Sequence, residues 1–346
     1  MFILAAIVVL AAAPAAQAQL AVTSNDNKVM LDNGTVKIVQ NPAPDTVTVL
    51  DLTASPPRVV AEIAVPGSVV GPPLSVALTP DESLALVGSS SKVDPGDPTK
   101  TVPDTRVSVI DLKASPPAVI ATLEAGKSAA GISINRRGTL ALVANRSEGT
   151  VSVFSISGKT VTPVGKVTIA DEKSGTSHAV FTPDGTMALV TRDGDHKISV
   201  LSVDGTKVEY TKRDINAGLR PYGIDVSSKG DFAAVANIGI GQGDTDTVSL
   251  IDIRAKPPRV VETVSVGQTP EGIKVSPDGR HVAVVVMNGS NKAKESPFYG
   301  DSGRPLTWCV AGTGMRSARP GSAVSFVGSV ILDEPHMVVT SGLIVT

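Results

Sequence analysis

The sequence has a single cysteine, Cys309, among its 346 residues. One thiol cannot form an internal disulfide, a CxxCH haem attachment or a zinc cluster built on thiolates, so these sites are excluded. Stability must therefore come from packing, with Val, Ala and Ile filling the layers between sheets. We expect no cofactor and no metal centre in this chain.

Aromatic side chains and net charge are also scarce. Only 3% of the residues are aromatic, and the formal net charge is −2. A chain without a basic stripe cannot neutralise phosphates, and few rings are present on which bases or sugars could stack. We therefore expect no nucleic-acid partner.

The apolar run at the N-terminus, residues 2–13, is too short to span a bilayer. Pro14 and the small-x-small sequence Ala16-Gln17-Ala18 follow it, as at a signal-peptide cleavage site. We interpret residues 1–18 as an export signal, although the basic n-region is missing, and a buried N-terminal strand is the alternative. The mature protein is then expected to be periplasmic or secreted, without a membrane span.

What the sequence does contain is a repeated β-type pattern, clearest between Thr247 and Asn288. An alternating run over 247–253 is followed by runs over 259–266, 272–276 and 281–287, with Pro, Gly and Asp between them. This punctuation predicts four short strands and no helix. A single four-stranded sheet cannot cover both of its faces, so copies must pack against it.

Copies of the unit recur at a period of about 45 to 56 residues, which is typical of propeller blades. Each copy has an inner-strand run, a turn and a second apolar run. The inner strands are predicted to begin near Ser75, Gly131, His178, Gly223 and Gly272. The fold class is therefore all-β, a β-propeller with five clear four-stranded blades and a partial first blade.

The first blade is incomplete at its N-terminal side. Residues 20–25 are typical of a second blade strand, and 46–52 with 58–65 supply the outer two strands. Between them, Asp32-Asn33-Gly34 predicts an inserted hairpin, because Asn and Gly tolerate the positive φ of a tight turn. The missing inner strand is expected to come from the other end of the chain, which closes a propeller.

The second apolar runs end in a recurring four-residue sequence. It reads Leu142-Val143-Ala144-Asn145, Ala234-Val235-Ala236-Asn237 and Val285-Val286-Met287-Asn288. On these residues and the linker over 266–272, residues 21–301 resemble the YVTN-repeat β-propellers, within the group of lactonase-like seven-bladed propellers. The resemblance implies seven blades in an intact chain. It says little about function, because propellers include enzymes, scaffolds and receptors.

Residues 304–346 do not follow the repeat. The only Trp and the only Cys of the chain fall here, in no recognisable period. The predicted organisation is thus a signal peptide over 1–18, a propeller over 19–303 and an aberrant segment over 304–346. We favour a shift of reading frame near Gly303 as its origin; a divergent closing segment with strands in 322–332 is the alternative.

Three predicted loops, 89–104, 238–246 and 288–304, are longer than the repeat requires. Clustered carboxylates could bind calcium there. The spacing matches no EF-hand loop, however, so solvated turn carboxylates are the favoured interpretation. The carboxylates are Asp94, Asp97, Asp104, Asp244 and Asp246.

The residues that begin successive inner strands should form a ring at one mouth of the central channel. The polar members give four candidate ligand-binding residues: His178, Arg220, Tyr222 and Glu271. Arg220 could hold a carboxylate bidentately, and His178 or Glu271 could act as a base. The alternative is a surface ion pair between Arg220 and Glu271, worth under about 1 kcal/mol.

Two functions fit this pattern, and the one favoured on sequence alone is an exported monomer that binds an unknown protein or small-molecule ligand through its mouth and loop face. The alternative is a lactonase-like hydrolase acting on a small anionic or lactone substrate. No GxSxG elbow supports a serine hydrolase, and the glycines of 239–243 precede a strand rather than a phosphate-binding helix. The catalytic residues stay unassigned.

Overall fold

The computed structural model describes residues 20–301, 303–311, 314–317 and 340–345. These residues form 28 β-strands and one short 3-10 turn, Glu172–Ser174. The all-β prediction is therefore confirmed for the described part of the chain. None of its helices is long and apolar enough to cross a membrane.

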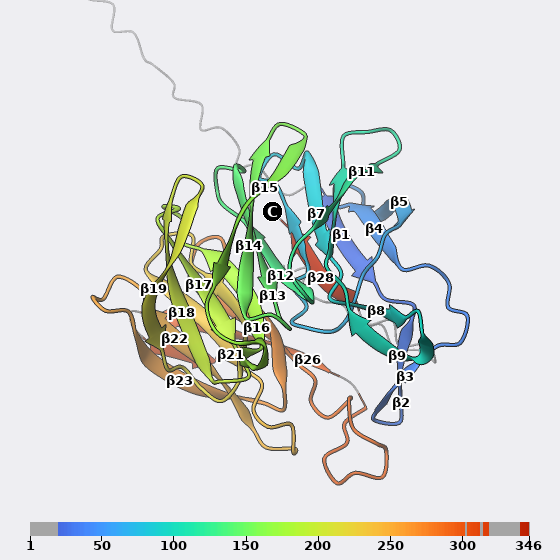
Figure 1. Cartoon of the computed structure of the whole chain (residues 1–346). Coiled ribbons are helices and arrows are strands. Elements are labelled where there is room, and N and C mark those ends of the chain that lie inside the picture. Colours follow the sequence, from blue (N-terminus) through green and yellow to red (C-terminus); the bar gives the residue numbers. More distant parts are fainter. Residues whose placement is uncertain (1–19, 302, 312–313, 318–339, 346) are drawn as a thin grey trace, which may run out of the picture.

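The strands form six four-stranded antiparallel sheets that follow one another in chain order (Figure 1). From the inner to the outer strand, sheet one contains β28 (Thr340–Val345), β1 (Leu20–Asn25), β4 (Thr46–Asp51) and β5 (Arg58–Ala64), and sheet two contains β6 (Val76–Leu78), β7 (Leu84–Gly88), β10 (Arg106–Asp111) and β11 (Ala118–Glu124). Sheet three contains β12 (Ala129–Ile134), β13 (Leu140–Asn145), β14 (Thr150–Ser157) and β15 (Thr160–Thr168), and sheet four contains β16 (Thr176–Phe181), β17 (Met187–Arg192), β18 (Lys197–Asp204) and β19 (Lys207–Ile215). Sheet five contains β20 (Pro221–Val226), β21 (Phe232–Asn237), β22 (Asp246–Asp252) and β23 (Arg259–Gly267), and sheet six contains β24 (Pro270–Val275), β25 (His281–Val286), β26 (Arg304–Ala311) and β27 (Gly314–Ser317). The inner strands begin close to the predicted positions.

The first sheet receives its inner strand from the C-terminal end of the chain. β28 pairs antiparallel with β1, with Ala21 opposite Val345 and Asn25 opposite Thr340, and Figure 1 shows the red β28 beside the blue β1. The expectation that the two ends of the chain share one blade is confirmed.

Sheet six takes its outer two strands from the stretch that departs from the repeat. β26 pairs with β25, Val282 lying opposite Trp308, and β27 pairs with β26. The segment 322–332 lies outside the described residues, as does the predicted signal peptide. The frame-shift hypothesis and the domain boundaries therefore stay predictions.

Apolar layers hold neighbouring sheets together. In the described part of the chain, five clusters join the six sheets in succession, and no sixth cluster joins sheet six to sheet one. The strand patterns show this difference: every residue of β13 is buried, whereas in β25 Val282 and Val284 are buried while Ala283 and Val285 are only half-buried. The arc of sheets is thus open between sheets six and one.

The signature Asn residues have a structural role. The Asn145 side chain is buried and donates to Thr150 Oγ1 at 2.8 Å and Ser152 Oγ at 2.9 Å, while its carbonyl oxygen accepts from the Gly126 amide at 2.9 Å. Asn25 and Asn237 each donate to two hydroxyls on the neighbouring strand in the same way. Asn145 therefore joins the second strand of its sheet to the third strand and to the linker at Gly126. Asn237, and Asn25 at the equivalent position of sheet one, join the second strand of their sheets to the third.

Two hairpins project from the mouth face, the end at which the inner strands begin. One, β2 (Val29–Asp32) with β3 (Thr35–Ile38), is the predicted hairpin, and its turn residues Asn33 and Gly34 have φ of 44° and 79°. The other, β8 (Ser91–Asp94) with β9 (Asp97–Pro103), was expected to be a loop. Its strands are largely exposed, so they need no apolar alternation and the sequence pattern does not reveal them.

The turns at the opposite end contain Asp residues that accept backbone hydrogen bonds. Asp184 Oδ1 accepts from Thr182 Oγ1 at 2.6 Å and from the Thr186 amide at 3.1 Å. The hydrogen bond from Thr182 is the main cause that lowers the Asp184 pKa below its ordinary 3.8.

We predict that Asp184→Ala lowers the free energy of unfolding by about 0.5 to 2 kcal/mol at pH 7, because the turn loses these bonds. A carboxyl with a depressed pKa stabilises the fold above its ordinary pKa, and this contribution is lost as the pH falls through that range. Urea unfolding at pH 7 and pH 3 should therefore show a difference that shrinks in acid. Equal stability of variant and parent at pH 7 would contradict the role.

Candidate functional site

A group of polar side chains from four sheets meets at the mouth face. Its members follow or begin the strands nearest the channel: Arg146 after β13, Asp193 after β17, Arg220 and Tyr222 at β20, and Glu271 in β24. We call these five residues the mouth cluster. The repeat places one such position in each sheet, so residues far apart in the chain converge here.

Asp193 is the centre of the mouth cluster. Its side chain is 3% exposed and lies between two guanidinium groups, 2.5 Å from Arg146 Nη1 and 2.9 Å from Arg220 Nη2. The Ser177 hydroxyl donates to the same carboxylate at 2.8 Å. Burial acts to raise the Asp193 pKa, but the bonds from Arg146, Arg220 and Ser177 hold it below its ordinary value. Two cations thus share this one carboxylate, so the mouth cluster has a net positive charge only while Glu271 is protonated.

Glu271 is the titratable group of the cluster. Burial raises the pKa of its carboxyl to about 7, and the positive charges of Arg146 and Arg220 limit the rise. The side chain makes no hydrogen bond to any described residue. A carboxyl that is half ionised near neutral pH and has no hydrogen bond to a described residue is suited to accept a proton from a substrate or water.

Tyr222 supplies a protonated hydroxyl beside these charges. The residue is 7% exposed, and the Arg146 guanidinium carbon lies 5.3 Å from its ring centroid, within the range of a cation–π interaction. Burial raises the Tyr222 pKa well above its ordinary value. The phenol therefore stays neutral at physiological pH, and its hydroxyl can donate or accept a hydrogen bond.

The structure brings together three of the four residues predicted from the sequence: Arg220, Tyr222 and Glu271. Arg220 forms its ion pair with Asp193 rather than with Glu271, so the simple surface pair considered above is not what the geometry shows. Because Asp193 is almost fully buried, the Arg220 contact is partly desolvated and more rigid than a surface pair.

The structure does not bring His178 into the mouth cluster. Its ring is 4% exposed and packs on Gly131, where a Cβ would lie 2.7 Å from His178 Cδ2. Its charged neighbours are Asp225 and Lys274, and burial lowers its pKa to about 4. Adjacent residues of a strand point to opposite sides, so His178 turns into the sheet packing while its neighbour Ser177 faces the mouth.

We predict that His178 makes the fold sensitive to acid. Between pH 6.5 and 4 the unfolded chain binds a proton at this imidazole that the folded chain does not, so stability falls as the pH falls. His178→Leu should remove roughly 3 kcal/mol of that loss. Urea unfolding between pH 7 and pH 4.5 measures how the free energy of unfolding changes with pH in the parent and in His178→Leu. A variant whose stability falls as steeply as that of the parent would contradict the prediction.

Sequence reasoning missed Arg146 and Asp193. The ring was built from inner strands alone, whereas these two residues directly follow the second strand of their sheets, after Asn145 and Arg192. The signal was available: a charged residue after the recurring strand end points to the same mouth. This signal can be used only once the end of each second strand is known to lie beside the start of the inner strand.

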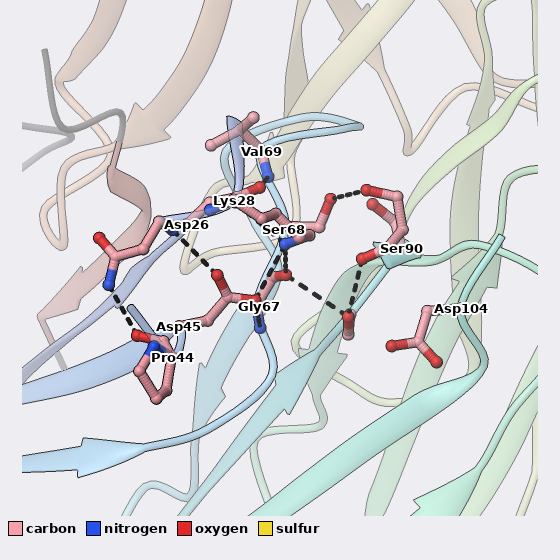
Figure 2. Close-up of polar contacts among 12 residues, drawn as sticks. Asp26, Lys28, Pro44, Asp45, Gly67, Ser68, Val69, Ser90 and Asp104 are labelled. Carbon is pink, nitrogen blue, oxygen red and sulfur yellow. Dashed lines mark hydrogen bonds and ion pairs between the residues drawn. The ribbon is translucent and has the colours of Figure 1, made fainter. Parts of the chain in front are cut away.

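A second polar network lies on the mouth face over sheets one and two (Figure 2). The Lys28 ammonium lies 3.0 Å from Asp26 Oδ1 and 2.9 Å from Asp45 Oδ2, and it also donates to the Gly67 carbonyl. Asp26 accepts in addition from the Val69 amide at 3.0 Å. These groups satisfy one another and tie the β2–β3 insertion to the linker before sheet two. We therefore assign this network, the Lys28 clamp, a structural role.

A cavity of about 260 Å³ adjoins the Lys28 clamp. It is lined by residues 42–45, 91–93, Lys28 and Arg106. Both Lys28 and Arg106 are already paired with carboxylates, at 2.9 Å and 2.6 Å. These two cations of the cavity lining are therefore engaged within the protein.

The acidic loop residues accept hydrogen bonds or pair with a cation close to their own positions. Asp104 is paired with Arg106, and the oxygens of Asp94 and Asp97 accept hydrogen bonds within their own turns. Asp246 accepts from the Thr269 amide, and burial together with nearby Asp244 raises its pKa to about 6. Within the described ranges no three His, Cys, Asp or Glu side chains gather as a metal would require.

Comparisons with known proteins agree with a lactonase-like propeller fold. The model of the family "Lactonase, 7-bladed beta-propeller" matches residues 157–294. The periplasmic gluconolactonase of Pseudomonas aeruginosa superposes with a TM-score of 0.58 at 15% identity, covering 86% of this chain and 82% of that chain.

Two further solved structures have the same fold. A putative 6-phosphogluconolactonase of Bacteroides fragilis gives a TM-score of 0.54 at 10% identity and covers 88% of this chain and 95% of its own. A protein of unknown function from Desulfotomaculum acetoxidans gives 0.61 at 14%, covering 86% and 78%. No curated protein matches. At such identities the likeness concerns the fold alone.

Proposed function

We propose that this protein is a lactonase-like hydrolase that opens a small lactone at the mouth cluster. The observation that carries the proposal is Glu271, a carboxyl with a pKa near 7 beside two guanidinium groups that share one buried carboxylate. The family match and the gluconolactonase titles of two structural neighbours support hydrolysis better than the binding module favoured on sequence alone.

The cluster contains the groups that lactone hydrolysis needs. Ionised Glu271 takes a proton from water, and the water oxygen bonds to the lactone carbonyl carbon. The negative charge that develops on the carbonyl oxygen is stabilised by the guanidinium groups of Arg146 and Arg220. The ring C–O bond then breaks, and the leaving alkoxide receives the proton from Glu271.

The guanidinium groups also suit the product, a hydroxy acid with a free carboxylate. Arginine binds carboxylates through parallel N–H donors, so Arg146 and Arg220 can contact the product carboxylate. Tyr222 can donate a hydrogen bond to the ring oxygen as it leaves. Substrate, transition state and product would thus all contact Arg146, Arg220 and Tyr222.

The direct test is turnover of a panel of lactones by the purified protein, followed as acid release at constant pH. The panel should span four-, five- and six-membered rings with neutral and anionic substituents. We expect hydrolysis of at least one ring class above the rate in buffer. No turnover of any member would overturn the proposal and favour a binding module.

We also propose that the protein is exported. The predicted signal over residues 1–18 lies outside the described residues, and a neighbour with the same fold is titled periplasmic. Fractionation of cells that express the full chain tests this. A chain found only in the cytoplasm with its N-terminus intact would contradict export.

A further inference from the structure

Exposed apolar side chains gather in the loops of the mouth face at sheets five and six. Leu219 is 43% exposed, Ile240 57%, Phe298 46% and Tyr299 38%. We call these four residues the apolar rim. Several other exposed apolar residues, such as Val119, Ile120, Val164 and Val261, lie instead on the outermost strands, far from the channel.

Backbone hydrogen bonds attach the apolar rim to the mouth cluster. The Gly239 amide donates to the Leu219 carbonyl at 3.2 Å, and the Ile238 amide donates to the Arg220 carbonyl at 3.1 Å. Leu219 is therefore the chain neighbour of a cluster guanidinium, and Ile240 follows the paired residues directly. The loop that carries Ile240 is thus held beside residues 219–220, which contribute one residue to the apolar rim and one to the mouth cluster.

The rim is a packed surface. The Phe298 ring lies against the Gly243 backbone, where an added Cβ would come within 2.2 Å of Phe298 Cγ. Gly243 also has a φ of 91°, so two independent reasons require glycine there. The Lys292 ammonium donates to the Gly241 carbonyl and joins the two loops. Phe298 and Lys292 thus hold the loop 287–301 against the loop 238–245.

The other side of the mouth offers little for a polar ligand. The ring positions from sheets two and three are Leu74, which is half-buried, and Ala130, which is buried. The side chains at these two positions offer no hydrogen-bonding group, so a polar substituent placed on them would lose water without compensation. An apolar substituent loses no hydrogen bonds when it leaves water, and its transfer to an apolar surface is favourable.

We propose that the lactone taken by this site carries an alkyl or aryl substituent, which packs on the apolar rim while the ring lies at the mouth cluster. The inference rests on the proposed lactonase function and names its substrate class. It separates this protein from hydrolases of polyhydroxylated sugar lactones, because the apolar rim and the ring positions Leu74 and Ala130 present carbon rather than hydrogen-bonding groups to a substituent.

The expected effect follows from burial. Each methylene moved from water onto the rim should raise kcat/KM by up to about fourfold, until the rim is covered after about four carbons. Gluconolactone should be hydrolysed more slowly than an alkyl-substituted lactone of the same ring size.

The experiment compares γ-lactones that carry hydrogen, methyl, butyl or hexyl on the carbon next to the ring oxygen. Ile240→Ser tests the rim, and Ile120→Ser on β11 is the matched control, because Ile120 is 44% exposed but lies on an outermost strand. We expect kcat/KM to rise with chain length in the parent and in Ile120→Ser. In Ile240→Ser the butyl and hexyl compounds should lose most of this advantage, at unchanged thermal stability.

The outcomes separate this inference from the proposal on which it rests. Hydrolysis that does not depend on chain length, or that is fastest for gluconolactone, overturns the substrate class and leaves the lactonase intact. A preference that survives in Ile240→Ser overturns the role of the rim. Absence of hydrolysis for every lactone overturns the lactonase itself.

Discussion

Glu271→Gln is expected to lower kcat/KM for lactone hydrolysis by about 10²- to 10⁴-fold, the range typical for loss of a general base. Gln has nearly the same shape and keeps the oxygen acceptor, but it cannot take a proton from water. The binding of the product hydroxy acid should change less, because it depends on the guanidinium groups. The matched control is Glu209→Gln on β19, since that carboxylate is 58% exposed and lies on an outer strand.

The pH dependence provides a second readout for the same residue. A base works only when ionised, so kcat/KM should rise with pH and level off above a midpoint near 7, where the Glu271 carboxyl titrates in the folded protein. Arg146→Met should move this midpoint to higher pH, because Arg146 is the strongest of the charges that lower the Glu271 pKa. A midpoint that does not move would contradict the assignment.

Stability measurements separate catalysis from folding. A carboxyl whose pKa is raised in the folded state favours the fold at low pH, and this contribution is lost as the pH rises from 4.5 toward 7. At pH 8 Glu271 is a half-buried charge that costs stability, so Glu271→Gln should be no less stable than the parent. An inactive variant that is also unfolded at pH 8 would show that Glu271 holds the fold instead.

The fold could be predicted from the sequence because a propeller repeats one pattern, and each copy strengthens the alignment of the others. The strand starts, the Asn33-Gly34 turn and the inner strand from the C-terminal end all follow from that register. The β8–β9 hairpin does not, because an exposed hairpin needs no apolar alternation. The opening between sheets six and one also has no local signature.

The site was only partly predictable. Aligning the repeats predicted that Arg220, Tyr222 and Glu271 lie at one mouth, because the inner strands of all sheets begin at the same end of the channel. Whether a side chain then faces the channel changes from one residue to the next along a strand. His178 faces the packing between sheets for this reason. Arg146 and Asp193 reach the mouth from the second strands, so only three-dimensional proximity reveals them.

Lys28→Met is expected to lower the free energy of unfolding by about 3 to 5 kcal/mol, the cost of leaving buried charges without their partner. The Lys28 side chain is 7% exposed, and its ammonium faces Asp26 and Asp45, whose side chains are 0% and 12% exposed. Methionine fills similar space but leaves two carboxylates facing each other, and the Gly67 carbonyl keeps only the long hydrogen bond of 3.4 Å from the Ser89 hydroxyl. The β2–β3 insertion and the linker to sheet two should loosen together.

Urea unfolding of the full chain at pH 7 measures this loss, and Lys100→Met is the matched control. Lys100 pairs with Asp97 at 2.8 Å, but its side chain is 71% exposed, so its removal should cost less than about 1 kcal/mol. Adding Asp26→Asn and Asp45→Asn to Lys28→Met should restore much of the stability, because the uncompensated charges disappear. If Lys28→Met is as mild as the control, or if the neutral triple variant is no better than the single one, burial of charge does not determine the strength of the Lys28 clamp.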